Sequence, residues 1–242
     1  MLKLMRGEIY RLLHKKSLYI YFASLAAGYL ILAFIRSGGF KDESAVNDAM
    51  SLFSLLPALA GGFLFAAIYT DDLNSKNLIS LVGYGVNKTA IIITKMILMA
   101  IFSIVIFGLV PVYHCAVYTI LGRTVTADMA ATIIAVSLKS LLTTIAYAVL
   151  SGTVVYGLQR ATFAIVSYLL LSFGVIGSLL SVALNTFAPG LLMYLMSSIT
   201  DAILLGLRSG GPLVLPVIEY IIYVIFGLSL STIVFFRKEM EF

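Results

Sequence analysis

Residues 91–120 read IIITKMILMAIFSIVIFGLVPVYHCAVYTI, and Lys95 carries the only formal charge in this run. A helix needs about 20 apolar residues to cross a bilayer, and a backbone in lipid must satisfy its own polar groups. The run therefore predicts a membrane-spanning helix. Lys95 is expected to extend its ammonium to the interface, so that the buried part begins near Met96. Pro111 is expected to kink the helix, which neighbouring helices can tolerate.

The composition of the whole chain indicates an integral membrane protein. Of 242 residues, 61% are hydrophobic and 11% are charged, whereas soluble domains carry about 25% charged residues. This length has room for about five to seven spans and none for a soluble catalytic domain. The single Cys115 excludes a disulfide framework. The formal charge of +5 fits basic inner loops and does not favour nucleic-acid binding, because no basic face is free of membrane.

Six apolar runs are predicted to cross the membrane, which makes the chain an all-α membrane protein with one transmembrane domain, 1–242. The other five runs are 18–35, 49–69, 129–156, 161–184 and 213–236. Lysine and arginine favour the cytoplasmic side. With the N-terminus inside, inner segments hold eleven such residues and outer segments four, so both termini are predicted to be cytoplasmic. The inner residues are Lys3, Arg6, Arg11, Lys15, Lys16, Lys76, Lys88, Lys95, Arg160, Arg237 and Lys238, the outer ones are Arg36, Lys41, Arg123 and Arg208, and Lys139 lies within a span.

Two further helices are expected outside the spans. Residues 1–17 place Leu2, Met5, Ile9, Leu12 and Leu13 at helical spacing, with Lys3, Arg6, Arg11 and Lys15 around the remaining face, which predicts an amphipathic helix in the inner interface. Residues 185–212 are expected to form an extracellular helical segment that dips into the outer leaflet or lies along it. A seventh crossing is the alternative, but it would place Arg237 and Lys238 outside, against the charge rule.

The sequence predicts no enzyme, no metal and no cofactor site in this chain, because the motifs of metalloproteases and serine hydrolases are missing. Only Lys139 and Glu219 are ionisable deep within predicted spans. Both spans enter from outside, and the two side chains are expected at a similar depth, where they could pair. They are interpreted either as a polar part of a substrate path or as a structural ion pair or two side chains that reach the interface.

The inner loop, 70–90, is the most informative polar stretch. Its residues 83–89, GYGVNKT, superficially match a phosphate-binding loop, but Asn87 replaces the glycine before the lysine and a membrane span follows. Asp71 and Asp72 end the second span. Asn74 and Ser75 are expected to cap a short helix from Lys76 to Val82, which Gly83 ends, and Asn87 is expected to cap the next helix.

The short helix carries an apolar face made of Leu78, Ile79, Leu81 and Val82. A helix of this length is not stable alone in water, so this face is expected to be buried. It is expected to contact a soluble partner, or else the membrane surface or the chain's own inner helix ends.

The stretch DDLNSKNLISLVGYGVNKTAIIITK resembles the inner loop of the small permease subunits of ABC type-2 exporters, nearest those for bacteriocins, lantibiotics and bacitracin-like peptides in Gram-positive bacteria. Three departures stand out, because Ser75 replaces a Gly-Thr pair, Leu73 replaces an aromatic residue, and Lys88 replaces an arginine. The six-span layout is also similar, although the residue match is confined to this loop. The matching residues are Asp72, Asn74, Lys76, Asn77, Ser80, Gly83, Gly85, Lys88 and Lys95.

The resemblance implies an ATP-driven exporter subunit in a bacterial plasma membrane. Its loop helix would dock on a separate ATPase subunit that binds ATP and Mg, and two permease copies or paralogues would pair within the lipid. The substrate would be amphipathic or hydrophobic, a peptide antibiotic or a lipid-like molecule. The implied ATPase-coupling residues are Asp72, Lys76, Asn77, Leu78, Ile79, Ser80, Leu81, Val82 and Tyr84. The rival hypotheses are a secondary carrier or channel-like protein without an ATPase, and a membrane-embedded assembly or sensor subunit.

Overall fold

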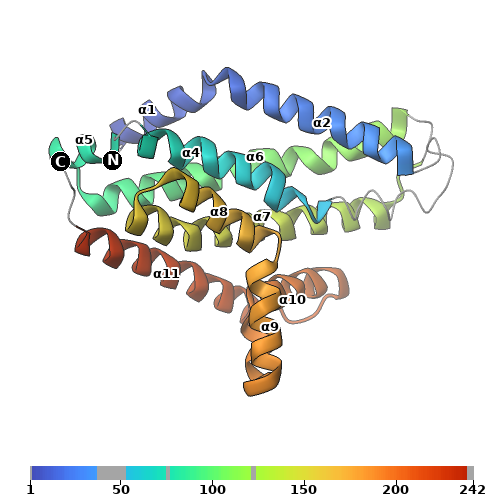
Figure 1. Ribbon diagram of the computed structural model, residues 1–242. Helices are drawn as coiled ribbons and strands as arrows, with labels where there is room; N and C mark the ends of the chain where they lie inside the picture. The colour runs from blue at the N-terminus through green and yellow to red at the C-terminus, as the bar shows by residue number, and fades with distance from the viewer. Residues whose placement is uncertain (1, 37–52, 75–76, 121–123, 239–242) are drawn as a thin grey trace.

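The computed structural model describes residues 2–36, 53–74, 77–120 and 124–238 (Figure 1). Helices account for 89% of these described residues, which contain no strands. This confirms the all-α fold class. The described elements are α1 (Leu2–Leu13), α2 (Lys16–Arg36), the π-helical turn η1 (Pro57–Gly61), α4 (Gly62–Asn74), α5 (Asn77–Gly83), α6 (Lys88–Ile120), α7 (Ala127–Leu158), α8 (Ala161–Ser172), α9 (Val175–Phe187), the 3₁₀ turn η2 (Pro189–Tyr194), α10 (Met196–Ser209) and α11 (Val214–Arg237).

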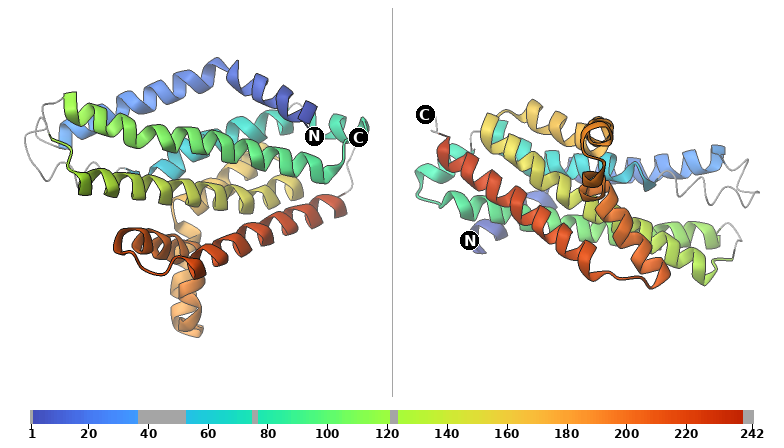
Figure 2. Two further views of the ribbon diagram at one scale, coloured as in Figure 1. Left: turned by 180° about the vertical axis from the view of Figure 1, so that it is seen from behind. Right: turned by 90° about the horizontal axis from the view of Figure 1, so that it is seen from below.

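The long helices lie side by side in one elongated bundle (Figures 1 and 2). Helix α7 is central in its contacts, because α6, α8, α10 and α11 all pack against it. Helices α1 and α2 meet at an angle and form an arch along one side of the bundle, whereas α9 projects away from it. Both chain ends and α5 lie at the same end of the bundle (Figure 1).

Three helices are long and apolar enough to cross a membrane, namely α6, α7 and α11. The pair α8 and α9 would supply a fourth crossing if it is one broken span. The described residues thus support three to four crossings, and the predicted six are not confirmed. One reason is that predicted span 49–69 is not a continuous α-helix, because a π-helical turn opens it at Pro57 and leaves only thirteen residues to α4.

The predicted fifth span, 161–184, is broken near its middle. Gly174 adopts a φ of +73°, a conformation that glycine reaches without steric cost, and α8 and α9 meet there at an angle of 56°. Beyond the break, none of the residues of α9 is buried. Apolar length alone predicted one straight helix, because it does not register a bend caused by a single residue with positive φ.

Pro111 lies inside α6, and a side chain of α7 replaces the hydrogen-bond donor that the proline lacks. Proline has no backbone N–H, so the carbonyl of Phe107, four residues earlier, loses its helical donor. The Ser137 hydroxyl donates a hydrogen bond to that carbonyl instead. A side chain of the neighbouring helix thus satisfies the backbone carbonyl that the proline leaves without its helical donor.

The segment between the last two predicted spans folds as η2 and α10 rather than as a seventh crossing. Helix α10 has 14 residues, which correspond to about 21 Å, whereas the hydrocarbon core is about 30 Å thick. Its inward face contacts α7 and α11 through one set of buried residues. These are Met196, Ile199, Thr200, Ile203 and Gly206.

Helix α7 offers a direct test of the predicted orientation, because its two ends lie at opposite ends of the bundle. In a background that lacks Cys115, cysteine at Thr124 should react with a membrane-impermeant maleimide added outside intact cells. Cysteine at Arg160 should react only after the membrane is opened. Both positions are exposed, so that access to the reagent depends on the side of the membrane. Outside labelling at Arg160 would contradict the predicted orientation.

Candidate functional site

The end of α5 is built by local turn chemistry. The N–H groups of Val86 and Gly85 donate to the carbonyls of Leu81 (3.0 Å) and Val82 (2.9 Å), which is a Schellman motif. The residue with positive φ is Gly85, at +79°. The prediction that Gly83 ends the helix is therefore corrected, because Gly83 is its last helical residue and Gly85 supplies the left-handed turn. The opening GYGVNKT stretch is a helix–turn–helix junction.

The next helix begins as predicted. The Asn87 side-chain oxygen accepts a hydrogen bond of 2.9 Å from the Thr89 N–H, which identifies Asn87 as the N-cap of α6. Lys88 then reaches back to the end of α11, where its ammonium donates to the Phe235 carbonyl at 2.9 Å. A cation at a helix C-terminus interacts favourably with the helix dipole. The loop is thus tied to the last helix of the chain.

Helix α5 presents one side to the chain and another to the outside. Leu78 is buried, and Val82 packs against the main hydrophobic core. Asn77 and Ser80 are exposed, and Tyr84, just beyond the helix, is 87% exposed. Of the expected apolar face, Leu81 is half-buried. Lys76 and the side chain of Ile79 lie outside the described residues.

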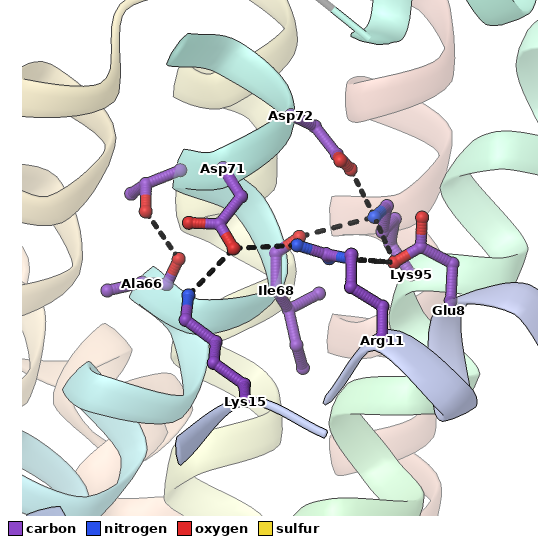
Figure 3. A network of polar contacts seen from close by, with 9 residues as sticks. Glu8, Arg11, Lys15, Ala66, Ile68, Asp71, Asp72 and Lys95 are labelled. Carbon is purple, nitrogen blue, oxygen red and sulfur yellow. Dashed lines mark hydrogen bonds and ion pairs between the residues drawn. The ribbon is translucent and has the colours of Figure 1, made fainter. Parts of the chain in front are cut away.

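Six charged side chains connect α1 and Lys15 with the last turn of α4 and the first turns of α6, and we call them the inner charge network, after the predicted orientation of the chain (Figure 3). Arg11 contacts Glu8 at 2.7 Å and Asp71 at 2.7 Å, and Lys15 also contacts Asp71 at 2.7 Å. Lys95 contacts Glu8 at 3.0 Å and pairs directly with Asp72. The network comprises Glu8, Arg11, Lys15, Asp71, Asp72 and Lys95.

The expectation that Lys95 extends to the interface is wrong. Its side chain is only 2% exposed, and its ammonium also donates to the Ile68 carbonyl at 3.2 Å. Burying an unpaired cation costs several kcal/mol, so Lys95 requires the carboxylates that surround it. Asp72 is likewise 1% exposed and points into the network. It is thus not accessible to a partner, although the sequence placed it among the coupling residues.

The carboxylates at the end of α4 explain why cations gather in this network. Asp71 and Asp72 lie in the last turn of this helix, where the dipole is negative and a carboxylate is unfavourable. Arg11, Lys15 and Lys95 supply three cations beside them. The charges of the three acids and three bases cancel, which allows Glu8, Asp72 and Lys95 to be withdrawn from water while the other three side chains stay partly exposed.

Glu8 shows how the network offsets burial. Withdrawal from water acts to raise the pKa of this carboxyl group, but the attraction of Lys95 and the hydrogen bonds from Arg11 and Lys95 outweigh it. The resulting pKa lies below the ordinary value of 4.5, so Glu8 is ionised at neutral pH. The sequence interpretation missed Glu8. Its spacing from Met5, Ile9 and Leu12 placed it on the inward stripe of α1, which was the available signal.

The two ionisable residues singled out deep in the spans do not pair with each other. Lys139 on α7 forms an ion pair with Asp201 on α10. Glu219, on α11, forms no ion pair with any described residue. The pairing of Lys139 with Glu219, which the sequence left open, is therefore not found among the described residues. The sequence could not show that α10 folds back against α7 and brings a carboxylate from outside the spans.

Across the described ranges, no three His, Cys, Asp or Glu side chains come together as a metal site. The chemistry of the site is therefore that of ion pairs, hydrogen bonds and an exposed helical edge. Comparison of the chain with protein-family models and with curated protein sequences finds no match.

Proposed function

We propose that the chain is the transmembrane subunit of an ABC type-2 exporter, moving an amphipathic or hydrophobic substrate outward. A separate ATPase subunit, which binds ATP and Mg, docks on the inner loop at residues 70–90. The observation that carries the proposal is α5. It is an ordered helix in a polar loop, and it holds Asn77, Ser80 and Tyr84 toward the outside.

The anchoring of α5 supports a role in transmitting force. A seven-residue helix is not stable alone, and here Leu78 and Val82 hold it on the bundle. A partner that moves α5 would therefore also move the core behind it. Asp71 and Asp72, a few residues before α5, would pass the movement to α1 and α6 through the inner charge network.

The docking surface of this proposal is narrower than the sequence suggested. Leu78 and Asp72 are already buried within the chain, so the ATPase would contact the exposed edge. Tyr84 is the principal candidate anchor, because exposed tyrosines often supply large shares of interface energy. In the proposal two permease copies or paralogues pair within a bacterial plasma membrane, with both termini cytoplasmic and the η2–α10 segment at the outer leaflet.

An apolar groove supports the proposed substrate chemistry. It lies between α6 and α7 beside Pro111 and has a volume of about 640 Å³. Its walls carry almost no polar surface, which suits an acyl chain or apolar side chains. The lining includes Ile104, Phe107, Pro111, Cys115, Ile134 and Leu141.

The docking assignment predicts that Tyr84→Asp combined with Ser80→Asp weakens ATPase binding by at least about 30-fold, the effect of losing a contact worth 2 kcal/mol. Both side chains are exposed, so the variant should keep the thermal unfolding midpoint of the wild type. Binding would be measured by co-purification and by stimulated ATP hydrolysis in vesicles.

Two controls separate docking from folding and from the rival carrier function. Tyr194→Asp places a charge on a half-exposed tyrosine of η2 and should leave ATPase binding unchanged. Leu78→Asp should lower the unfolding midpoint, because Leu78 is buried. Full ATPase binding by a well-folded Tyr84→Asp/Ser80→Asp variant would contradict the proposed docking surface. Substrate movement in vesicles that contain no ATPase would favour the rival hypothesis of a secondary carrier.

A further inference from the structure

The cations of the first helix are divided between two faces. Arg11 and Lys15 face the bundle and are paired with carboxylates of the inner charge network. Lys3 and Arg6 are exposed and form no ion pair with any described residue. Lys16, at the start of α2, is also exposed and also forms no ion pair with any described residue. The amphipathic pattern of residues 1–17 did not distinguish these two sets.

The exposed cations share their face with exposed aromatic and aliphatic side chains. Lys3, Arg6, Tyr10 and Leu13 follow one another at intervals of three and four residues, so they form one stripe along α1. Tyr10 is 66% exposed and Leu13 is 47% exposed. Across the bend, Tyr19 and Ile20 continue this exposed apolar surface. Such a combination of cations and large apolar groups is typical of helices that lie in a membrane interface.

We propose that this outward stripe of α1, together with Lys16, binds the headgroups of anionic phospholipids. Charge complementarity carries the assignment, because Glu8 is the only acidic residue in the described segment 2–36 and it points away from the stripe. Unpaired cations at a membrane surface attract anionic lipid, and Tyr10 and Leu13 would lie at the level of the headgroups. The ligand chemistry is a phosphodiester with net negative charge held in a bilayer.

This binding would act on the rest of the protein through the opposite face of the same helix. Glu8 and Arg11 join α1 to Lys95 and Asp71 on that side. Lipid headgroups that hold α1 in place would therefore also stabilise the inner charge network. The inference needs only that α1 lies at the membrane surface, and it does not depend on an ATPase partner.

The experiment uses the absence of tryptophan from the chain. A Tyr10→Trp variant of the full-length protein carries one fluorophore in the stripe. It would be reconstituted in vesicles of equal parts phosphatidylglycerol and phosphatidylcholine, with either lipid brominated in turn. Bromine quenches nearby tryptophan, so the two quenching series give the relative association of each lipid with α1.

The quenching series should show that phosphatidylglycerol associates with α1 in preference to phosphatidylcholine, by a factor of about five for each cation at the surface. Lys3→Gln, Arg6→Gln and Lys16→Gln together should therefore lower this preference by roughly 100-fold. The preference should also shrink at about 1 M salt, where the screening length is only about 3 Å. A matched control, Arg160→Gln, Arg237→Gln and Lys238→Gln, removes three exposed cations elsewhere and should leave it unchanged.

Equal quenching by the two brominated lipids in the Tyr10→Trp protein would overturn the proposal. So would strong quenching by both lipids that is unaffected by loss of the three cations, because the contact would then be purely apolar. If neither lipid quenches the tryptophan, α1 does not face the bilayer and its stripe is available to a protein instead. None of these results would bear on ATPase docking at Tyr84.

Discussion

Replacement of Lys95 by methionine should destabilise the protein by about 3–5 kcal/mol, the usual cost of removing one partner from a buried ion pair. The side chains of Lys95 and Asp72 are each 2% exposed, so the substitution leaves the Asp72 carboxylate without a counter-ion and without water. Glu8 loses its contact with Lys95 as well, although Arg11 still binds it. The loss would be measured as a shift in unfolding of the purified protein during titration with sodium dodecyl sulfate in mixed micelles.

Two further variants separate charge imbalance from lost packing. Adding Asp72→Asn to Lys95→Met neutralises the carboxylate that lost its counter-ion and leaves Glu8 and Asp71 balanced by Arg11 and Lys15, so it should recover most of the stability. Lys15→Gln disrupts a more exposed pair with Asp71, whose side chain is 40% exposed, and should cost 1 kcal/mol or less. A Lys95→Met protein as stable as Lys15→Gln would show that the buried pair contributes nothing.

Gly227→Ala should also be strongly destabilising, by about 1–3 kcal/mol, because the contact between α7 and α11 leaves no room for a methyl group. A Cβ atom at this position would lie 2.5 Å from the Val149 Cγ1 atom. Valine is rigid at χ1 in a helix and cannot simply rotate away. Close approach of helices at small residues is a common basis for packing in membranes.

The compensating variant for Gly227→Ala is Val149→Ala, which removes the clashing methyl group. The double variant should therefore be more stable than the sum of the two single effects predicts. Gly108→Ala serves as the matched control in α6, because nothing lies within 4 Å of its added Cβ. It should be neutral or stabilising by about 0.5–1 kcal/mol. If Gly227→Ala resembles Gly108→Ala, the two helices are not as close as described.

Features governed by neighbouring residues were the ones that the sequence predicted best. The Asn87 cap depends on an oxygen two residues from the N–H that it binds. The loop helix was placed within one residue at each end, because its apolar spacing and flanking glycines act locally. The sequence named Gly83 as the residue that ends this helix, whereas the structure shows that Gly85 does so. Both glycines can adopt the required backbone conformation, and only the hydrogen bonds distinguish them.

Span number was predicted less well because hydropathy measures length and not continuity. The runs at 91–120, 129–156 and 213–236 each contain one long helix. The run at 161–184 has the same character in sequence but divides at Gly174. A single glycine in an apolar helix is usually tolerated, and nothing in the local pattern shows that this one takes a positive φ and bends the chain.

By itself, the sequence determined that this protein is helical, apolar and built around a structured polar loop, because composition, periodicity and turn chemistry act over a few residues. Only the tertiary structure decided which charges meet. Lys95 finds Glu8 across 87 positions of sequence, and Lys139 finds Asp201 across 62 rather than Glu219. Buried ions must be paired, which requires that Lys95 have a partner, but the choice of partner depends on how the helices pack. That packing makes α1 the helix that joins the last turn of α4 to the first turns of α6.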